Sequence, residues 1–194
     1  MKFSYKRKFI LVNAFIVFLL LLAFYFDKQI ISLISLIRND ILNDFFMGIT
    51  FISSILIIFL FLTILFIKEN KRRWIFPLWA VLAIDIVVGF LLKISIQRQR
   101  PFQLGLVSVA QGLEKASHYA WDFSFPSFQA MMIFSAVPFL SREFPKFKYV
   151  WIIFACLVAF SRVYLGLHFL SDVIAGALIG YMIGYFVVRK VEGR

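Results

Sequence analysis

The sequence predicts an all-α integral membrane protein, a six-transmembrane-helix bundle with a short interfacial helix. Of its 194 residues, 62% are hydrophobic and only 16% are charged. Apolar runs recur along the chain at close to the length that crosses a bilayer. Each such run satisfies its backbone hydrogen bonds internally when it forms a helix, so helices rather than open sheets are expected.

The first predicted span runs from Phe9 to Phe26 and follows a basic stretch, Lys6-Arg7-Lys8. It is followed by Asp27 rather than by a small-residue cleavage site, so an uncleaved span is expected and not a signal peptide. The other five spans are expected at about 46–67, 74–92, 126–141, 149–165 and 170–188.

Two connections are expected to lie at the membrane surface. Residues 30–45 alternate apolar and charged groups, which is typical of a helix lying in the interface. Residues 102–125 form the longest connection, and the apolar spacing there, with Tyr119 and Trp121, favours a short helix at the headgroup level. No linker or low-complexity tract interrupts the pattern, so residues 1–194 are expected to form a single domain.

The net charge of +11 is distributed by membrane side, which argues against a nucleic-acid partner. Fourteen of the 21 Lys and Arg residues lie at the two termini and in segments 68–73 and 142–148, which share one side if there are six spans. The positive-inside rule predicts that this side is cytoplasmic, in a multi-pass protein of the cell membrane. The other seven are Lys28, Arg38, Lys93, Arg98, Arg100, Lys115 and Arg162.

Two segments on the predicted outer side carry groups suited to phosphate. Lys93 and Arg100, which precedes Pro101, flank the exit of the third span, and their point charge and donor fork both suit phosphate oxygens. Pro126 and Ser127 start an apolar run, where free backbone N–H groups, the helix dipole and a hydroxyl favour an anion. The alternatives are a cluster of interfacial anchors and an ordinary helix start.

A third segment holds the candidate nucleophile. Arg162 is followed six residues later by His168, and Asp172 lies four residues beyond the histidine. On a helix, this spacing allows the carboxylate to orient the imidazole. The other ring nitrogen then keeps a lone pair that is able to attack phosphorus and form a phosphohistidine.

Read in order, the segments are K-x6-R-P, P-S and S-R-x5-H-x3-D, and together they resemble the type-2 phosphatidic acid phosphatase superfamily of membrane lipid phosphatases. The resemblance covers about residues 93–172. It implies that His168 is the nucleophile, with Asp172 as its orienting partner. It also implies a set of phosphate-binding residues, Lys93, Arg100, Ser127 and Arg162.

The second motif departs from the pattern of this superfamily, which usually reads P-S-G-H. Here Phe128 and Gln129 replace the Gly-His pair, so the histidine that serves as general acid and later as base is absent. A diphosphate needs little protonation of its leaving group, so a polyprenyl or other lipid diphosphate is the expected substrate. The alternative is a substitute acid in the 102–125 connection, from the set Glu114, His118 and Asp122.

Asp85 lies within a predicted span, where an acid is costly; a structural hydrogen bond is favoured over a role in tuning the site. Its candidate partners are Tyr164, Ser95 and Ser135. No cluster has metal-ligand spacing, so neither a metal nor another cofactor is expected.

The sequence therefore predicts a metal-independent phosphatase whose partners are a lipid phosphate or diphosphate substrate and membrane lipids. Two alternatives stay open: a lipid phosphotransferase, and a catalytically inactive lipid-phosphate binding protein. The sequence leaves the oligomeric state undetermined.

Overall fold

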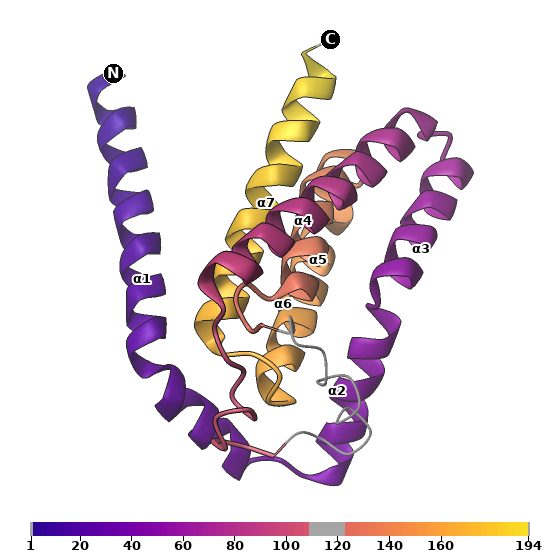
Figure 1. Cartoon of the computed structure of the whole chain (residues 1–194). Coiled ribbons are helices and arrows are strands. Elements are labelled where there is room, and N and C mark those ends of the chain that lie inside the picture. The colour runs from indigo at the N-terminus through magenta and orange to yellow at the C-terminus, as the bar shows by residue number, and fades with distance from the viewer. Residues whose placement is uncertain (1, 109–122, 194) are drawn as a thin grey trace.

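The computed structural model describes residues 2–108 and 123–193, and these form helices joined by short turns (Figure 1). The helices are α1 (Lys2–Leu36), α2 (Asp40–Ile52), α3 (Ile55–Lys68), α4 (Ile75–Ile96), α5 (Phe128–Glu143), α6 (Lys148–Tyr164) and α7 (Leu170–Glu192). Two short 3₁₀ turns, η1 (Arg72–Trp74) and η3 (Pro145–Phe147), lead into α4 and α6. The described residues contain no strand, so the all-α class is confirmed.

Within this part of the chain, four segments are long and apolar enough to cross a membrane. They are Val17–Leu36 of α1, η1 with α4, η3 with α6, and α7. The helices α2 and α3 are bent by 57° at their junction and make a fifth if they are counted as one broken span. Helix α5 has only 16 residues, so length and composition support four or five spans, and the number six stays a prediction.

The prediction of one interfacial helix over residues 30–45 is wrong. Helix α1 continues to Leu36, and α2 begins only at Asp40. Between them lies Asn39, which has an extended backbone and caps the start of α2. Its side-chain oxygen accepts a hydrogen bond from the Leu42 N–H at 3.0 Å. In the second connection, residues 102–105 form turns and 106–108 are irregular, and the remainder of the predicted headgroup helix lies mostly outside the described residues.

Helices α5 and α7 make the closest contact in the bundle. A Cβ atom added at Gly180 would lie 1.9 Å from the Met131 carbonyl oxygen, and one added at Gly176 would lie 2.5 Å from that of Ser127. Glycine therefore lets the two backbones touch, as in other tightly packed membrane helices. This contact fixes the start of α5, and with it Ser127, against the first turns of α7.

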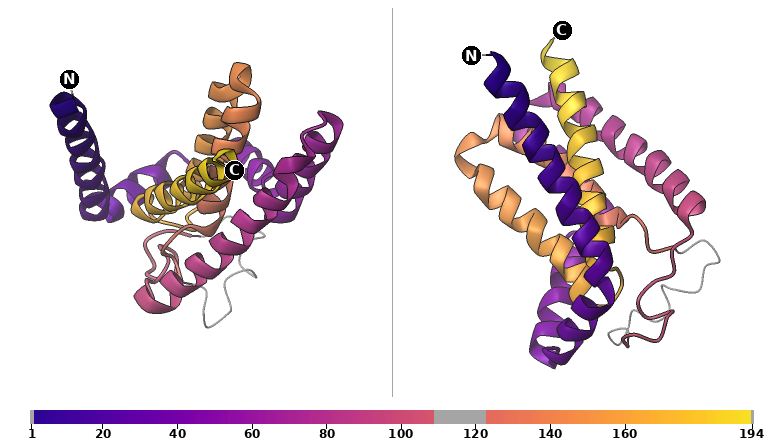
Figure 2. Two further views of the ribbon diagram at one scale, coloured as in Figure 1. Left: turned by 90° about the horizontal axis from the view of Figure 1, so that it is seen from above. Right: turned by 90° about the vertical axis from the view of Figure 1, so that its left-hand side faces the viewer.

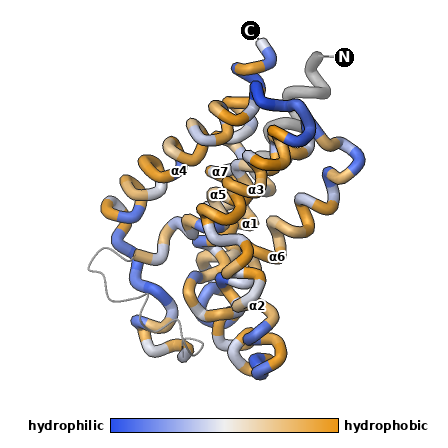
Figure 3. The backbone as a smooth tube through the Cα atoms, turned by 90° about the vertical axis from the view of Figure 1, so that its right-hand side faces the viewer, coloured by the Kyte–Doolittle hydropathy of each residue, from blue (hydrophilic) through white to orange (hydrophobic). Residues whose placement is uncertain are grey.

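The two termini lie at the same end of the bundle, and the helix ends that carry the three motifs lie away from it (Figures 1 and 2). Apolar residues cover the helices along their length, whereas hydrophilic residues gather in the turns at both ends (Figure 3). The N-terminal half of α1 stands apart from the other helices, and its C-terminal half approaches α7 (Figures 1 and 2).

Asp85 is completely buried in α4, as expected for an acid that faces the bundle interior. Of its three candidate partners, Ser135 is close enough to act on the carboxyl group, but the Ser135 hydroxyl donates to the Met132 carbonyl at 2.9 Å. Neither carboxyl oxygen of Asp85 has a hydrogen-bond partner among the described residues. A structural hydrogen bond between Asp85 and Ser135 therefore stays a prediction.

Candidate active site

Four helix ends and the α6–α7 turn bring the predicted site residues into one region. Lys93 lies in the last turn of α4, which ends because Gln97 adopts a left-handed conformation with φ of 51°. This turn redirects the chain, so that the two arginines that follow, Arg98 and Arg100, reach the start of α7 and the α6–α7 turn. Arg162 comes from the last turn of α6.

His168 is 3% exposed, and its surroundings fix its tautomer. Its Nδ1 atom lies 2.8 Å from the Ser124 carbonyl oxygen. A carbonyl only accepts, so Nδ1 carries the proton and donates it. The lone pair therefore resides on Nε2, which accepts a hydrogen bond from the Arg100 guanidinium at 3.0 Å. The imidazole thus has a defined donor side and a defined nucleophilic side.

Burial and three nearby cations set the charge state of this imidazole. Burial lowers the pKa of His168 well below its usual 6.5, and the positive charges of Arg100, Lys93 and Arg162 lower it further. The ring is consequently neutral at pH 7 and keeps its lone pair. The same three charges are those expected to bind phosphate, so the structure brings the cationic set together around His168.

Asp172 is fully buried but does not pair directly with His168, since its Oδ2 atom lies 3.9 Å from Nδ1. The expected contact fails because His168 precedes the first residue of α7, so the helical i, i+4 geometry does not apply. Instead the Ser124 hydroxyl donates to Asp172 while the Ser124 carbonyl accepts from the imidazole. Ser124 therefore stands between the two.

The carboxylate of Asp172 is held by further donors. Its Oδ2 atom accepts the Phe169 N–H at 2.9 Å, which caps the first turn of α7. Its Oδ1 atom accepts from the Arg98 guanidinium at 2.7 Å. The aspartate is consequently fixed in position by the helix start and by an arginine between the motif residues Lys93 and Arg100.

The cations have structural contacts of their own. The Arg100 guanidinium donates to the Leu167 carbonyl at 2.8 Å, and Lys93 Nζ donates to the Phe123 carbonyl. Arg162 lies 3.5 Å from the Thr50 hydroxyl of α2. These contacts orient the charges toward His168 from α4, from the turn after it and from α6.

Ser127 is buried at the start of α5, and its hydroxyl has no hydrogen-bond partner within the described part of the chain. An unsatisfied buried hydroxyl of this kind suits a phosphoryl oxygen. Its backbone N–H, which was also expected to bind phosphate, donates to the Asp172 carbonyl at 3.0 Å. The hydroxyl, rather than that N–H, is therefore available to a ligand.

The two residues that depart from P-S-G-H both have structural partners. The Gln129 amide donates to the carbonyls of Thr50 and Ser53, each at 3.1 Å, and so satisfies acceptors at the break between α2 and α3. The Phe128 ring packs against Gly89 of α4, where an added Cβ would lie 2.7 Å from ring carbons. Gln129 thus satisfies carbonyl groups at the C-terminal end of α2, where Arg162 also contacts Thr50.

The sequence did not identify Asp27, Ser124 and Ser171 as members of this region, and it gave Arg98 no role beyond anchoring. The available signals were weak: an acid at the end of the first apolar run, and a serine two residues before Pro126. The possible substitute acids Glu114, His118 and Asp122 lie outside the described residues. In the ranges that are described, no three His, Cys, Asp or Glu side chains form a metal-binding group.

Comparison with known proteins gives a consistent family. The PAP2 superfamily model matches residues 73–194. An undecaprenyl-diphosphatase from Sulfolobus acidocaldarius is 34% identical over 127 residues, 65% of this chain and 59% of that protein. Phosphatidylglycerophosphatase B from Bacillus subtilis is 28% identical over 182 residues, 86% of this chain and 83% of that protein.

Solved structures agree with these sequence matches. The crystal structure of a transmembrane PAP2-type phosphatidylglycerolphosphate phosphatase from Bacillus subtilis has a TM-score of 0.73 and 26% identity, covering 94% of this chain and 96% of that one. The crystal structure of Aquifex aeolicus LpxE has a TM-score of 0.67 and 27% identity, covering 84% of this chain and 94% of that one.

Proposed function

Because this chain belongs to the PAP2 superfamily, we propose that it is a membrane phosphatase that hydrolyses a lipid-linked phosphate through a phosphohistidine at His168. One observation carries the proposal. A neutral, buried imidazole presents the lone pair of Nε2 among three cations, with its other nitrogen fixed by Ser124. This arrangement suits attack on an anionic phosphoryl group.

In the proposed reaction, the Nε2 lone pair forms a bond to phosphorus as the bond from phosphorus to the leaving oxygen breaks. The Arg100 N–H that contacts Nε2 turns to a phosphoryl oxygen, so the lone pair is released as the phosphate binds. Lys93 and Arg162 offset the charge on the other oxygens, and no metal is required for that task. Water then attacks phosphorus, the P–N bond breaks and its electron pair returns to Nε2, and the oxygen and both protons of the water leave with the phosphate as dihydrogen phosphate.

We further propose a lipid diphosphate as the substrate, a polyprenyl diphosphate being the first candidate. The amide of Gln129 cannot protonate a leaving group and is engaged with the break between α2 and α3. A phosphate monoester leaving from a diphosphate is a weak base, so the missing acid costs little there. The undecaprenyl-diphosphatase relative supports the same substrate class.

The test is phosphate release by the purified protein from a polyprenyl diphosphate and from a lipid monophosphate. We expect the diphosphate to be cleaved at least about a hundredfold faster, because only the monoester needs general acid catalysis. Comparable rates would instead indicate a substitute acid. Transfer to an added alcohol in place of phosphate release would identify a phosphotransferase. Tight binding of both lipids without turnover would identify a binding protein.

We also propose six spans in the cell membrane, with both termini cytoplasmic and the site on the extracytoplasmic side. Two observations support this topology: the termini lie at one end of the bundle, which requires an even number of crossings, and fourteen basic residues flank that end. In a Cys156→Ala background, an impermeant thiol reagent applied to intact cells should label Leu104→Cys and not Glu69→Cys. Reversed labelling would place the site in the cytoplasm.

A further inference from the structure

Helix α1 contributes a buried acid to the neighbourhood of the site. Among its described side chains the buried ones are Ala23, Asp27 and Ile31, which are spaced four residues apart and share one helix face. Burial of a carboxylate is costly unless it is paired and hydrogen-bonded, and Asp27 is only 2% exposed. Its partners should therefore reveal why the acid is there.

Asp27 reaches across to the first turn of α7. Its Oδ1 atom accepts the Ser171 backbone N–H at 3.0 Å, and its Oδ2 atom accepts from the Ser171 hydroxyl. The start of a helix carries partial positive charge and unpaired N–H groups, so it favours a carboxylate. Ser171 is the residue directly before Asp172, so Asp27 lies beside the residue expected to support His168.

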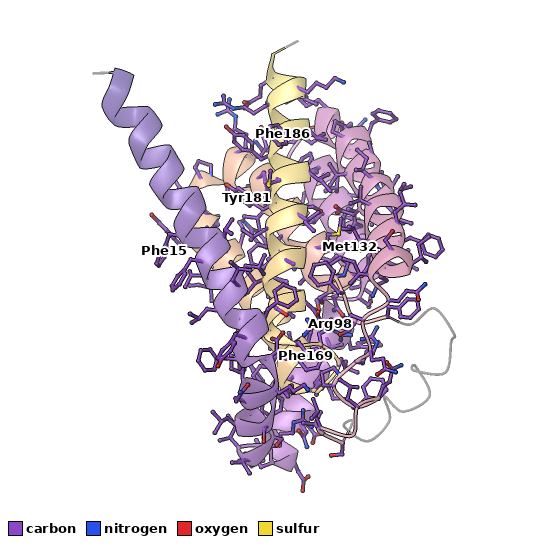
Figure 4. All side chains as sticks on the ribbon, turned by 60° about the vertical axis from the view of Figure 1, so that its left-hand side comes forward. Phe15, Arg98, Met132, Phe169, Tyr181 and Phe186 are labelled. Atoms are coloured by element: carbon purple, nitrogen blue, oxygen red, sulfur yellow. The ribbon has the colours of Figure 1, made fainter. Side chains whose placement is uncertain are left out.

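Arg98 links the two carboxylates. One guanidinium nitrogen donates to Asp172 Oδ1 at 2.7 Å, and the other donates to Asp27 Oδ2 at 2.7 Å. The guanidinium also lies over the rings of Phe24 and Phe169, 5.0 and 4.2 Å from their centroids. Figure 4 shows Arg98 close to Phe169. Both its hydrogen bonds and its ring contacts therefore hold it in one place, which a lysine ammonium would not reproduce.

Resting on the function proposed above, we propose that Arg98 and Asp27 are positioning residues: Arg98 holds the Asp172 carboxylate and offsets its charge, and Asp27 holds Arg98 and the first turn of α7 in place. Asp27 lies outside the region matched by the family model, which begins at residue 73. Helix α1 therefore helps to position the site residues through Asp27, in addition to its role as a membrane span.

The charge count gives this proposal a sharp consequence. The cluster of Asp27, Arg98 and Asp172 holds two carboxylates and one guanidinium, so it carries one net negative charge, and Asp172 Oδ2 lies 3.9 Å from His168 Nδ1. The cations Lys93, Arg100 and Arg162 lower the pKa of the imidazole, and a change in the charge of the cluster would act against or with them. Arg98→Gln makes the cluster more negative, Asp27→Asn makes it neutral, and the double variant restores the original net charge.

The parent protein, Arg98→Gln, Asp27→Asn and the double variant form a double-mutant cycle. They are to be compared by kcat, KM and the titration of His168. The titration is followed by NMR of ¹⁵N-labelled histidine in a His118→Gln background, where His168 is the single histidine. Arg98→Gln should raise the pKa of His168, because added negative charge favours imidazolium, and Asp27→Asn should lower it. In the double variant the pKa should return toward that of the parent protein.

Each single variant should also lower kcat by roughly ten- to hundredfold, as is typical when the partner of a supporting group is removed. KM should change little, because the phosphate-binding cations are retained, and the double variant should be faster than Arg98→Gln alone. Arg73→Gln is the matched control, since it breaks an arginine–carboxylate pair between η1 and Glu143 at the other end of α5. It should leave both kcat and the titration unchanged.

The result that would overturn the proposal is a His168 titration and kcat in both single variants like those of the parent. A double variant no better than Arg98→Gln, in pKa and in rate, would also overturn it. If Arg98→Gln does not fold, Arg98→Lys takes its place, and it should keep the titration near that of the parent while lowering kcat. Absence of turnover in the parent would refute the proposed function alone, because the NMR titration does not depend on turnover.

Discussion

Replacement of His168 by alanine should abolish phosphate release and phosphoenzyme formation, with a loss of kcat of at least about a thousandfold. The reason is that Nε2 carries the lone pair that faces the region of the three cations, and alanine has no atom that could accept the phosphoryl group. Measurement requires steady-state phosphate release and trapping of acid-labile phosphoenzyme from a labelled diphosphate. Turnover of His168→Ala within roughly tenfold of the parent would refute the assignment.

Ser124→Ala is the informative companion to that variant. It keeps the backbone carbonyl that accepts the His168 Nδ1 proton and removes only the hydroxyl that donates to Asp172. Its rate should therefore fall much less than that of His168→Ala, and phosphoenzyme should still form. Equal losses in the two variants would show that the hydroxyl, and not the histidine alone, is essential for the first step.

The fold was largely predictable because apolar runs of span length have few alternatives in a bilayer. The break between α2 and α3 was not, since residues 46–67 read as one continuous apolar run. In the structure, the chain bends there after Ser53, whose hydroxyl donates to the Ile49 carbonyl at 2.7 Å. Ser53 is followed by Ser54, which precedes the first residue of α3, so the serine pair marks the break; serines also occur in straight helices, which makes this signal a weak one.

The clustering of Lys93, Arg100 and Arg162 around His168 follows from the motif order, because Lys93 and Arg162 lie in the last turns of α4 and α6 and Arg100 lies just after α4; that these residues bind phosphate stays a prediction. The group that orients His168 was not predictable from the sequence. A helical spacing pointed to Asp172, whereas α7 begins after the histidine and a backbone carbonyl of Ser124 makes the contact. Backbone acceptors leave no trace in residue identities. The Asp27–Arg98 pair likewise joins segments 71 residues apart, and only the packed structure relates them.

Restoring Gly-His with Phe128→Gly and Gln129→His should raise hydrolysis of a lipid monophosphate by about a hundred- to ten-thousandfold, the range typical of general acid catalysis. Hydrolysis of a lipid diphosphate should rise much less, because its leaving group is already a weak base. The measurement is kcat/KM for both substrates in the parent and the double variant. The ratio of the two kcat/KM values, rather than either value alone, shows whether a general acid protonates the leaving group.

The Gly-His variant should be less stable than the parent, and a third substitution should recover part of the lost stability. Gln129→His removes the hydrogen bonds that the Gln129 amide donates to the part-buried carbonyls of Thr50 and Ser53, and the loss should cost about 1 kcal/mol of stability. Phe128→Gly empties the space beside Gly89, and adding Gly89→Ala should refill part of it, since the ring that would clash with a Cβ is then gone. Gly89→Ala alone should instead destabilise the parent.

Gln129→Ala is the control that separates acid supply from helix release. It frees the break between α2 and α3 from the amide but provides no proton donor, so the monophosphate rate should stay low while stability falls. A rise in that rate with Gln129→Ala would mean that the amide restrains the site. No rise with the Gly-His variant would mean that a different group already protonates the leaving oxygen, and Glu114, His118 and Asp122 would be the residues to replace next.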